Sequence, residues 1–278
     1  MKVRFFGWMT TVAALAVSVM LLTMPGVGQE AAKGAPKAGG KGGKQRPKGG
    51  PVPRTADGKP NFDTHPGVWN VPYVTNMERA SQWGGTDVVP PFTAKGKEFH
   101  DLNVKTNSAG DPEGYCLPPG VPRMMYTPYP MKMVQMPDRV IFMFEGGAHV
   151  WREVPIGPKE KLTHPDDPNP TYLGDSYGYW EGDTLVIDVV GFNERTWLDF
   201  NGHGHGEKLH VVERYKMTDS LNMEYSATIE DPDFYTAPWT VTVNIPHNPN
   251  GRLLEYICQE NEKDTRHLEE IMRQSKGK

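Results

Sequence analysis

The sequence is poor in cysteine, and this shortage narrows the class of protein. Only two of the 278 residues are cysteines, and no C-x-x-C pattern or Cys/His cluster accompanies them. The chain therefore offers no thiolate set for a structural zinc site of the usual kind, and nothing in the sequence requires a cofactor. The pattern G-x-S-x-G occurs at residues 174–178, but it runs into a predicted strand at 176–180 and not into the strand–turn–helix of a nucleophile elbow, which argues against a hydrolase of that kind.

Long apolar runs are absent as well, and the one short run lies near the start of the chain. Lys2 and Arg4 precede an apolar stretch at residues 11–22, and small residues follow it up to Gly28. This order predicts a signal peptide over residues 1–28, cleaved after Gly28, and therefore a secreted or periplasmic protein. The stretch is too short to span a bilayer comfortably, so a membrane anchor through an uncleaved signal is the alternative.

The two cysteines agree with export. Cys116 and Cys258 lie on opposite sides of the predicted core and can pair in an oxidising compartment. We therefore predict a disulfide between them, with two buried free thiols as the alternative.

Charge is divided unevenly along the chain. The net charge of -4 includes +2 from residues 1–28 and +6 from residues 29–54, so residues 55–278 carry -12. A domain this acidic argues against nucleic acid as a partner. Segment 29–53 is rich in Gly, Lys and Pro and has no apolar periodicity. It is predicted to be a disordered basic linker whose contact with an anionic membrane surface is at most weak.

The remaining residues, 54–278, have the length of a single domain with a sizeable core. Residues 54–129 are rich in Pro, Gly, Asn and Asp, which predicts a loop-rich half. From residue 131 onward, short β-rich runs alternate with turn residues, as is typical of an antiparallel sandwich or barrel. A charged stretch at 261–274 predicts a short C-terminal helix. The predicted strands are 131–136, 139–145, 148–154, 176–180, 184–190, 208–217, 221–230, 238–245 and 252–257.

Alternation along these strands places two charges among apolar neighbours. Glu213 is in phase with the apolar residues of strand 208–217, and Arg152 is in phase with those of strand 148–154. Because an interior charge is costly unless paired or hydrated, the two residues predict either a salt bridge in the core or a polar ligand pocket. Tyr179, Trp197 and Tyr215 are candidates for the aromatic lining of such a pocket, with core packing as the alternative.

Segment 199–210 holds the densest set of potential metal ligands and acid–base groups. It contains Asp199, His203, His205 and His210 among several glycines. Such a set can bind a divalent metal or move protons, so Asp199, His203 and His205 join Glu213 as catalytic candidates. His203, His205 and His210 are the candidate metal ligands, although their spacing matches no established metal motif. The alternative is a glycine-rich loop that carries solvent-exposed histidines.

Several blocks of sequence stand out together. They are W-E-G-D-T-L-V-I-D at 180–188 followed by E-R-Y at 213–215, with R-T-A-D-G-K-P-N at 54–61 and C-L-P-P-G-V-P-R at 116–123. The combination resembles a large family of secreted proteins that is abundant in soil and environmental bacteria. The resemblance covers residues 54–262 and implies a lipocalin-like antiparallel barrel, but it supplies no reaction. Gly204 and the link 61–66 depart from the family's usual pattern.

Two functions of different classes follow as predictions. The first is an exported protein that holds a small, partly apolar molecule in an interior pocket with polar groups. The second is a barrel enzyme in which Glu213 or Asp199 works with a histidine in acid–base or metal-assisted chemistry on a similar ligand. A structural role in the cell envelope is a third alternative.

Overall fold

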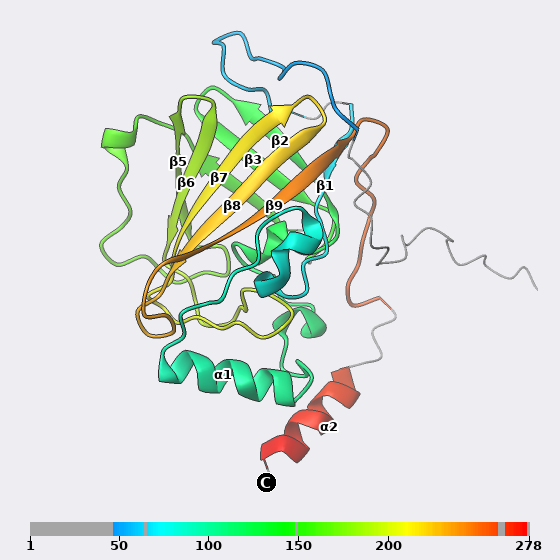
Figure 1. The fold of residues 1–278 in the computed structure, drawn as a ribbon, viewed down its shortest axis with the longest axis vertical. Coiled ribbons are helices and arrows are strands. Elements are labelled where there is room, and N and C mark those ends of the chain that lie inside the picture. The colour runs from blue at the N-terminus through cyan, green and yellow to red at the C-terminus, as the bar shows by residue number, and fades with distance from the viewer. Residues whose placement is uncertain (1–46, 64–65, 148–149, 261–264, 277–278) are drawn as a thin grey trace, which may run out of the picture. The chain divides into compact units, whose positions relative to one another are not determined.

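The computed structural model describes residues 47–63, 66–147, 150–260 and 265–276 (Figure 1). Residues 46–278 form one compact unit. The predicted signal peptide, 1–28, and most of the predicted linker, 29–53, lie outside the described residues. The last linker residues belong to the unit, because the Ser220 amide donates to the Gly50 carbonyl at 3.0 Å and the Asn222 side chain donates to the Pro47 carbonyl at 3.0 Å. The unit therefore begins before the predicted boundary at residue 54.

In the described part of the chain, nine strands form one sheet in the order β4-β3-β2-β1-β9-β8-β7-β6-β5 (Figure 1). Every neighbouring pair in this order is antiparallel, which confirms the predicted mainly β, antiparallel fold. The strands are β1 (Val68–Asn70), β2 (Pro130–Met136), β3 (Arg139–Phe144), β4 (Trp151–Pro155), β5 (Asp175–Glu181), β6 (Thr184–Val190), β7 (His210–Asp219), β8 (Asn222–Glu230) and β9 (Trp239–Asn248).

The sequence forms these strands because its side chains alternate and its turns are tight. In β8 every second residue from Met223 to Ile229 is buried, and the residues between them are half-buried or exposed. One face of the strand therefore joins the core. Gly182, between β5 and β6, has φ +60°, a conformation that suits the two-residue hairpin loop and favours glycine.

The two edge strands of the sheet, β4 and β5, come together at one end. Ile156 and Gly178 form an isolated parallel bridge, and the Gly157 amide donates to the Gly178 carbonyl at 3.0 Å. Side chains add a second link, because Nε of Arg152 donates to Oγ of Ser176 at 3.0 Å. These contacts leave fewer unpaired backbone groups at the sheet edges.

Two short α-helices and four 3-10 helices accompany the sheet among the described residues. The C-terminal helix predicted at 261–274 is confirmed as α2 (Thr265–Lys276), while residues 261–264 lie outside the described residues. The other helices are α1 (Ala94–Lys105), η1 (Met77–Trp83), η2 (Pro112–Tyr115), η3 (Arg123–Met125) and η4 (Lys159–Lys161). No described helix is long and apolar enough to cross a membrane.

One predicted strand is absent from the described part of the chain, and the predicted loop-rich half contains two elements that were not predicted. Residues 252–257 are not a strand, and the Leu254 amide donates to the Glu145 carboxylate at 2.7 Å instead of joining a ladder. The predicted loop-rich half contains α1, which Thr93 caps by accepting a hydrogen bond from the Gly96 amide. It also contains the three-residue strand β1. Helix α1 escaped prediction because its few apolar residues and its internal glycine give almost no helical pattern.

Candidate functional site

The two charges predicted to point inward meet in the core. Arg152 of β4 and Glu213 of β7 are buried and form an ion pair of 2.6 Å, which confirms the predicted meeting. Tyr215 and Tyr225 donate from their hydroxyls to the other oxygen of Glu213, at 2.7 and 2.9 Å. Burial, followed by the charge of Glu213, raises the pKa of both tyrosines well above the usual value. Both hydroxyls are therefore donors at neutral pH.

This core network satisfies itself. Oγ of Ser176 accepts from both Nε and Nη2 of Arg152, at 3.0 and 2.8 Å, and the guanidinium lies 5.8 Å from the ring centre of Phe142. The positive charge is matched by Glu213, so the network is neutral. Arg152 also lines a pocket of about 630 Å³ between β4 and β5, but it is only 4% exposed. The network has the character of a structural ion pair.

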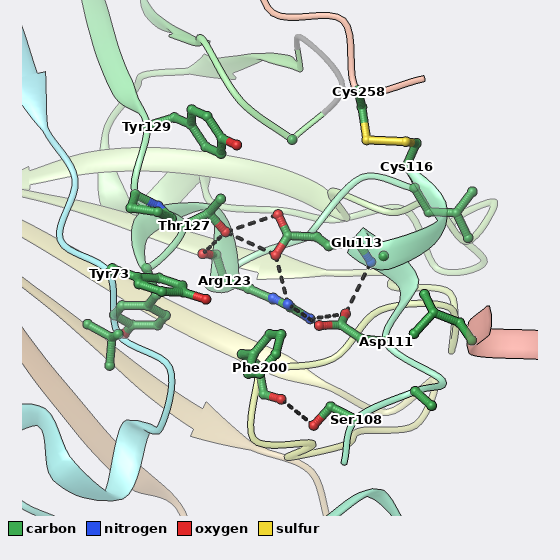
Figure 2. Close-up of a pocket in the computed structure, with 18 of the residues that line it drawn as sticks. Tyr73, Ser108, Asp111, Glu113, Cys116, Arg123, Thr127, Tyr129, Phe200 and Cys258 are labelled. Atoms are coloured by element: carbon green, nitrogen blue, oxygen red, sulfur yellow. Dashed lines mark hydrogen bonds and ion pairs between the residues drawn. A yellow bond between two sulfur atoms is a disulfide. The ribbon is translucent and has the colours of Figure 1, made fainter. Parts of the chain in front are cut away.

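A second group of polar residues lies at the base of a pocket of about 580 Å³ (Figure 2). We call this pocket the Arg123 pocket. Three segments form most of its lining: residues 107–117 with η2, residues 123–129 with η3, and part of α2. The lining also includes Tyr73, Val74, Gly147, Phe200, Tyr256 and Cys258. Sequence reasoning assigned no role to the charged residues of this pocket.

The charges of the Arg123 pocket are held by local turns. Asp111 accepts from the Glu113 amide at 3.1 Å and so caps η2, where Pro112 suits the first helical position. Both oxygens of Asp111 also receive hydrogen bonds of 2.7 Å from the guanidinium of Arg123. A two-point contact of this kind fixes the orientation of the guanidinium plane.

Glu113 is the second carboxylate on the same guanidinium. Its Oε2 lies 2.7 Å from Nη2 of Arg123, and the hydroxyl of Thr127 donates to it at 3.2 Å (Figure 2). Burial raises the pKa of Glu113 despite the nearby guanidinium, and the charge of Asp111 contributes to the rise. One guanidinium thus serves two carboxylates, and with both ionised the pocket base carries a net charge of -1.

Aromatic side chains make up much of the remaining wall. Tyr73, Tyr129 and Phe200 lie around the charged base, and the ring of Tyr129 is 4.7 Å from that of Tyr256 (Figure 2). The predicted disulfide is confirmed at the rim of this pocket. Cys116 and Cys258 are joined there, with Cα atoms 5.6 Å apart.

A third group surrounds Asp199 and His203, two of the predicted catalytic candidates. The Leu198 amide donates to the His203 carbonyl at 2.7 Å, so the chain turns back between them. Gly202 permits this turn because its φ is +88° and an added Cβ would lie 2.3 Å from that of Asn103. The turn brings Nδ1 of His203 to 2.7 Å from Oδ2 of Asp199.

The buried Asp199 carboxylate holds the His203 imidazole in a fixed orientation. Asp199 also accepts hydrogen bonds from the Met77 amide at 2.8 Å and the His203 amide at 3.2 Å. Burial disfavours the charged imidazolium, but the charge of Asp199 and its hydrogen bond outweigh this effect and raise the pKa of His203 to about 9. Without a further ligand, His203 is therefore positively charged at neutral pH.

Two residues that sequence reasoning missed complete this group. Oε1 of Glu78, in η1, lies 3.4 Å from Nε2 of His203, and the ring centre of His100, in α1, lies 4.5 Å from that of His203. The hydrogen bond with His203 lowers the pKa of Glu78, whereas burial and the charge of His203 lower the pKa of His100. Phe92 stacks on both imidazoles, at 5.2 Å from His100 and 5.6 Å from His203.

The other two histidines of segment 199–210 lie apart from His203. His205 is buried, with Nε2 at 2.6 Å from the Thr196 hydroxyl and Nδ1 at 3.0 Å from the Gly206 carbonyl. His210 lies on the sheet, with Nε2 at 3.1 Å from both oxygens of Asp188. His203, His205 and His210, the three candidate metal ligands, each face different partners and do not come together as one ligand set.

The predicted ligand-binding residues lie away from the Arg123 pocket. Tyr215 belongs to the core network, Trp197 packs edge-on against Phe99 at 6.1 Å, and the ring of Tyr179 lies 4.9 Å from Nζ of Lys159. None of these three, nor Arg152 or Glu213, lines that pocket. Their predicted binding role gains no support from their positions.

One signal in the sequence could have pointed to the Arg123 pocket. Arg123 ends the block C-L-P-P-G-V-P-R, which begins at the cysteine expected to pair, and Asp111 and Glu113 lie just before that cysteine. Glu78 and His100 offer no such signal, since they come from two separate helices, η1 and α1.

Comparison with protein-family models, with curated proteins and with solved structures finds no significant match to this chain. The resemblance to a family of secreted bacterial proteins therefore stays a prediction.

Proposed function

We propose that this is an exported small-molecule-binding protein whose ligand is held in the Arg123 pocket. The observation that carries the proposal is an open pocket of about 580 Å³ with aromatic walls and a charged base of Arg123, Asp111 and Glu113. Small-molecule sites commonly have about 300–1,000 Å³, apolar walls and a few convergent polar groups. The expected interior pocket is thus replaced by one built from loops, η helices and α2.

The charge of the pocket favours a cationic or hydrogen-bond-donating ligand. Arg123 is 3% exposed and is already bound by both carboxylates, so it has little capacity left for an anion. Glu113 keeps 21% of its side chain exposed and has oxygens available to accept. Tyr73 and Phe200 add aromatic surface, on which an organic cation is also stabilised. The ligand class we propose is a small aromatic or amphipathic amine.

We infer that the nine-stranded sheet curls into a lipocalin-like barrel closed between β4 and β5. The parallel bridge from Ile156 to Gly178 and the hydrogen bonds from Arg152 to Ser176 support this closure. Export to the periplasm or the medium is supported by the Cys116–Cys258 disulfide, since such bonds persist in oxidising compartments.

Two matched probes test the proposed ligand class. Phenethylammonium and 3-phenylpropionate have the same ring and spacer but opposite charges. We expect calorimetry with the wild-type protein to show binding of the ammonium and at least about tenfold weaker binding of the carboxylate, which corresponds to about 1.4 kcal/mol. Glu113→Gln should remove most of this preference.

A carboxylate outside the pocket provides the control. Glu224 is exposed on β8, so Glu224→Gln removes the same charge from the protein without touching the pocket. It should bind phenethylammonium like the wild type. Equal affinity for both probes, or equal losses in Glu113→Gln and Glu224→Gln, would refute the proposed ligand class.

The alternative function, acid–base or metal-assisted catalysis, is favoured by one observation. Asp199 and His203 form a buried carboxylate–imidazole pair of 2.7 Å, which is a common arrangement for proton transfer. Neither residue lines the Arg123 pocket, so a ligand there would not reach them directly. The wall residue Phe200 follows Asp199 in the chain and is the nearest covalent link between the two groups. Binding without catalysis therefore remains the function that we propose.

A further inference from the structure

The group around His203 has the composition of a metal site as well as of a proton relay. Among the described residues, Glu78, His100 and His203 form a set of three potential ligands whose donor atoms all lie within 4.8 Å of one another. The three side chains come from η1, α1 and the loop before β7. They are separate from the Arg123 pocket and from the core network.

We propose that Glu78, His100 and His203 bind a divalent transition metal of the zinc class, with Asp199 as the positioning residue for His203. Two imidazole nitrogens and one carboxylate oxygen are a ligand set that zinc accepts, with a fourth position left for water or another ligand. The proposal is independent of the function proposed for the Arg123 pocket. It concerns binding of the metal and not a reaction.

The orientation of His203 is the strongest geometric support. Its Nδ1 lies 2.7 Å from the Asp199 carboxylate, so Nε2 is the nitrogen that faces Glu78. Ligand histidines typically donate their other ring N–H to a carboxylate, which fixes the ring and raises its basicity. Asp199 is itself held by the Met77 amide, so the supporting contact is already present.

The donor atoms of Glu78, His100 and His203 need to move only a little to reach the spacing of a zinc site. Ligand atoms at the usual zinc distances in a tetrahedral site lie roughly 3.3 Å apart. Nε2 of His203 and Oε1 of Glu78 are already 3.4 Å apart, so mainly the third donor, from His100, has to approach. His100 is oriented by the Asn201 side chain at 3.0 Å and by stacking on Phe92.

The charge around His203 and the exposure of Glu78 also suit a bound divalent cation. Glu78 and Asp199 place two carboxylates at 3.4 and 2.7 Å from the His203 imidazole. A divalent cation bound there would balance the charge of these two carboxylates. The Glu78 side chain is 31% exposed and that of His100 is 12% exposed, whereas His203 is fully buried. The ion would therefore enter from the side of Glu78.

A rival histidine cluster provides the matched control. His164 and His210 both contact Asp188. His164 also contacts Asp175, and Nδ1 of His210 lies 3.7 Å from Glu230, so this cluster has two imidazoles and three carboxylates. The donor atoms of the rival cluster do not form a compact set of the kind found around His203 within the described part of the chain. Zinc binding that depends on His100 but not on His210 would separate the two clusters.

The test is equilibrium dialysis of the full chain against Zn²⁺, with the metal content measured by mass spectrometry. We expect one tightly bound zinc per wild-type chain and the same result for His210→Gln. Glu78→Gln and His100→Gln should each bind at least about tenfold more weakly, and Asp199→Asn should lose about 10–100-fold, as supporting residues of metal sites do. Zinc should also raise the melting temperature of the wild type but not that of His100→Gln.

A measurement on the unaltered protein protects the test against variants that fail to fold. One equivalent of Zn²⁺ should shift the imidazole ¹⁵N resonances of His100 and His203 and leave those of His164 and His210 in place. The proposal is overturned if the wild type retains no zinc. It is also overturned if the zinc shifts the resonances of His164 and His210 instead, or if folded Glu78→Gln and His100→Gln bind zinc like the wild type.

Discussion

Among the described residues two arginines are buried, and their surroundings differ in the number of carboxylates and in the access to a pocket. Arg152 and Arg123 are 4% and 3% exposed, and each forms a short ion pair with a buried carboxylate. Arg152 has one carboxylate, and the hydroxyls of tyrosine and serine complete its network. Arg123 has two carboxylates, and it lies at the base of an open pocket.

The difference shows how a structural ion pair can be distinguished from a binding site. Burial alone does not separate the two arginines, because both are almost fully covered. A network with balanced charge and satisfied hydrogen bonds has no remaining capacity to bind a ligand. A pocket with excess charge beside accessible aromatic walls can bind one. The following predictions test this distinction, beginning with the largest expected effect.

The core network should be the more sensitive to loss of one partner. Arg152→Met or Glu213→Leu leaves an unpaired charge in the core and should cost about 3–5 kcal/mol of unfolding free energy. The double variant should cost less than the sum of the two, because no charge remains. Urea denaturation of the wild type, the two single variants and the double variant gives the double-mutant cycle. Single losses below about 0.5 kcal/mol would mean that both side chains are hydrated, contrary to the structure.

The disulfide should matter mainly at the Arg123 pocket. Replacing Cys116 and Cys258 by serine opens a loop with a sequence separation of 142 residues and should cost about 2–4 kcal/mol. Amide hydrogen exchange should increase in η2 and α2 more than in β7 and β8, which lie away from the bridge. Uniform loss of protection over the sheet would show that the bridge supports the whole unit instead. Reduced wild-type protein is the control.

Glu113 should make the pocket sensitive to pH. Burial raises the pKa of this carboxyl above its usual value of 4.5, so folding is favoured while it is protonated. Its contribution is fully present below pH 4.5 and is lost as pH rises through the raised pKa. The stability of the wild type relative to Glu113→Gln should therefore increase on acidification from neutral pH. A difference between the two proteins that stays constant with pH would contradict the burial effect.

The smallest effect is expected at the half-exposed pair of His210 and Asp188. The hydrogen bond that His210 donates to the Asp188 carboxylate raises the pKa of His210 above 6.5, although burial opposes the rise. The stabilisation is present below pH 6.5 and is lost as pH rises through the raised value. Solvent screening keeps this contribution small, because the His210 side chain is 35% exposed. The unfolding free energies of the wild type and His210→Gln should therefore become equal at alkaline pH. A difference between them that grows at alkaline pH would contradict the raised pKa of His210.

Much of the fold could be predicted from the sequence, because alternation and tight turns are local signals. Strands β2 to β9 and helix α2 were all anticipated, β6 with the same ends and the others with ends that differ. The inward phase of Arg152 and Glu213 came from the same alternation, since period two fixes the face on which a side chain lies. The two cysteines, together with the export signal, were enough to predict their pairing.

The candidate sites were harder to predict, because their residues come together only through long loops. Asp199 and His203 were found because they are four residues apart, but Glu78 and His100 reach them from distant positions. Helix α1 has too little apolar pattern to be recognised, so nothing in the sequence placed His100 near His203. Asp111, Glu113 and Arg123 lie in a turn-rich segment whose short 3-10 helices have no periodic signature.

The central claim is that the Arg123 pocket, and not the core network, is the ligand site. A crystal structure of the protein with bound phenethylammonium tests it most directly. The account predicts the ammonium within hydrogen-bonding distance of Glu113 and the ring against Tyr129 or Phe200, with the Arg152–Glu213 pair unchanged. A probe found between Arg152 and Ser176 or beside Glu213, with the Arg123 pocket empty at a saturating concentration, would contradict it.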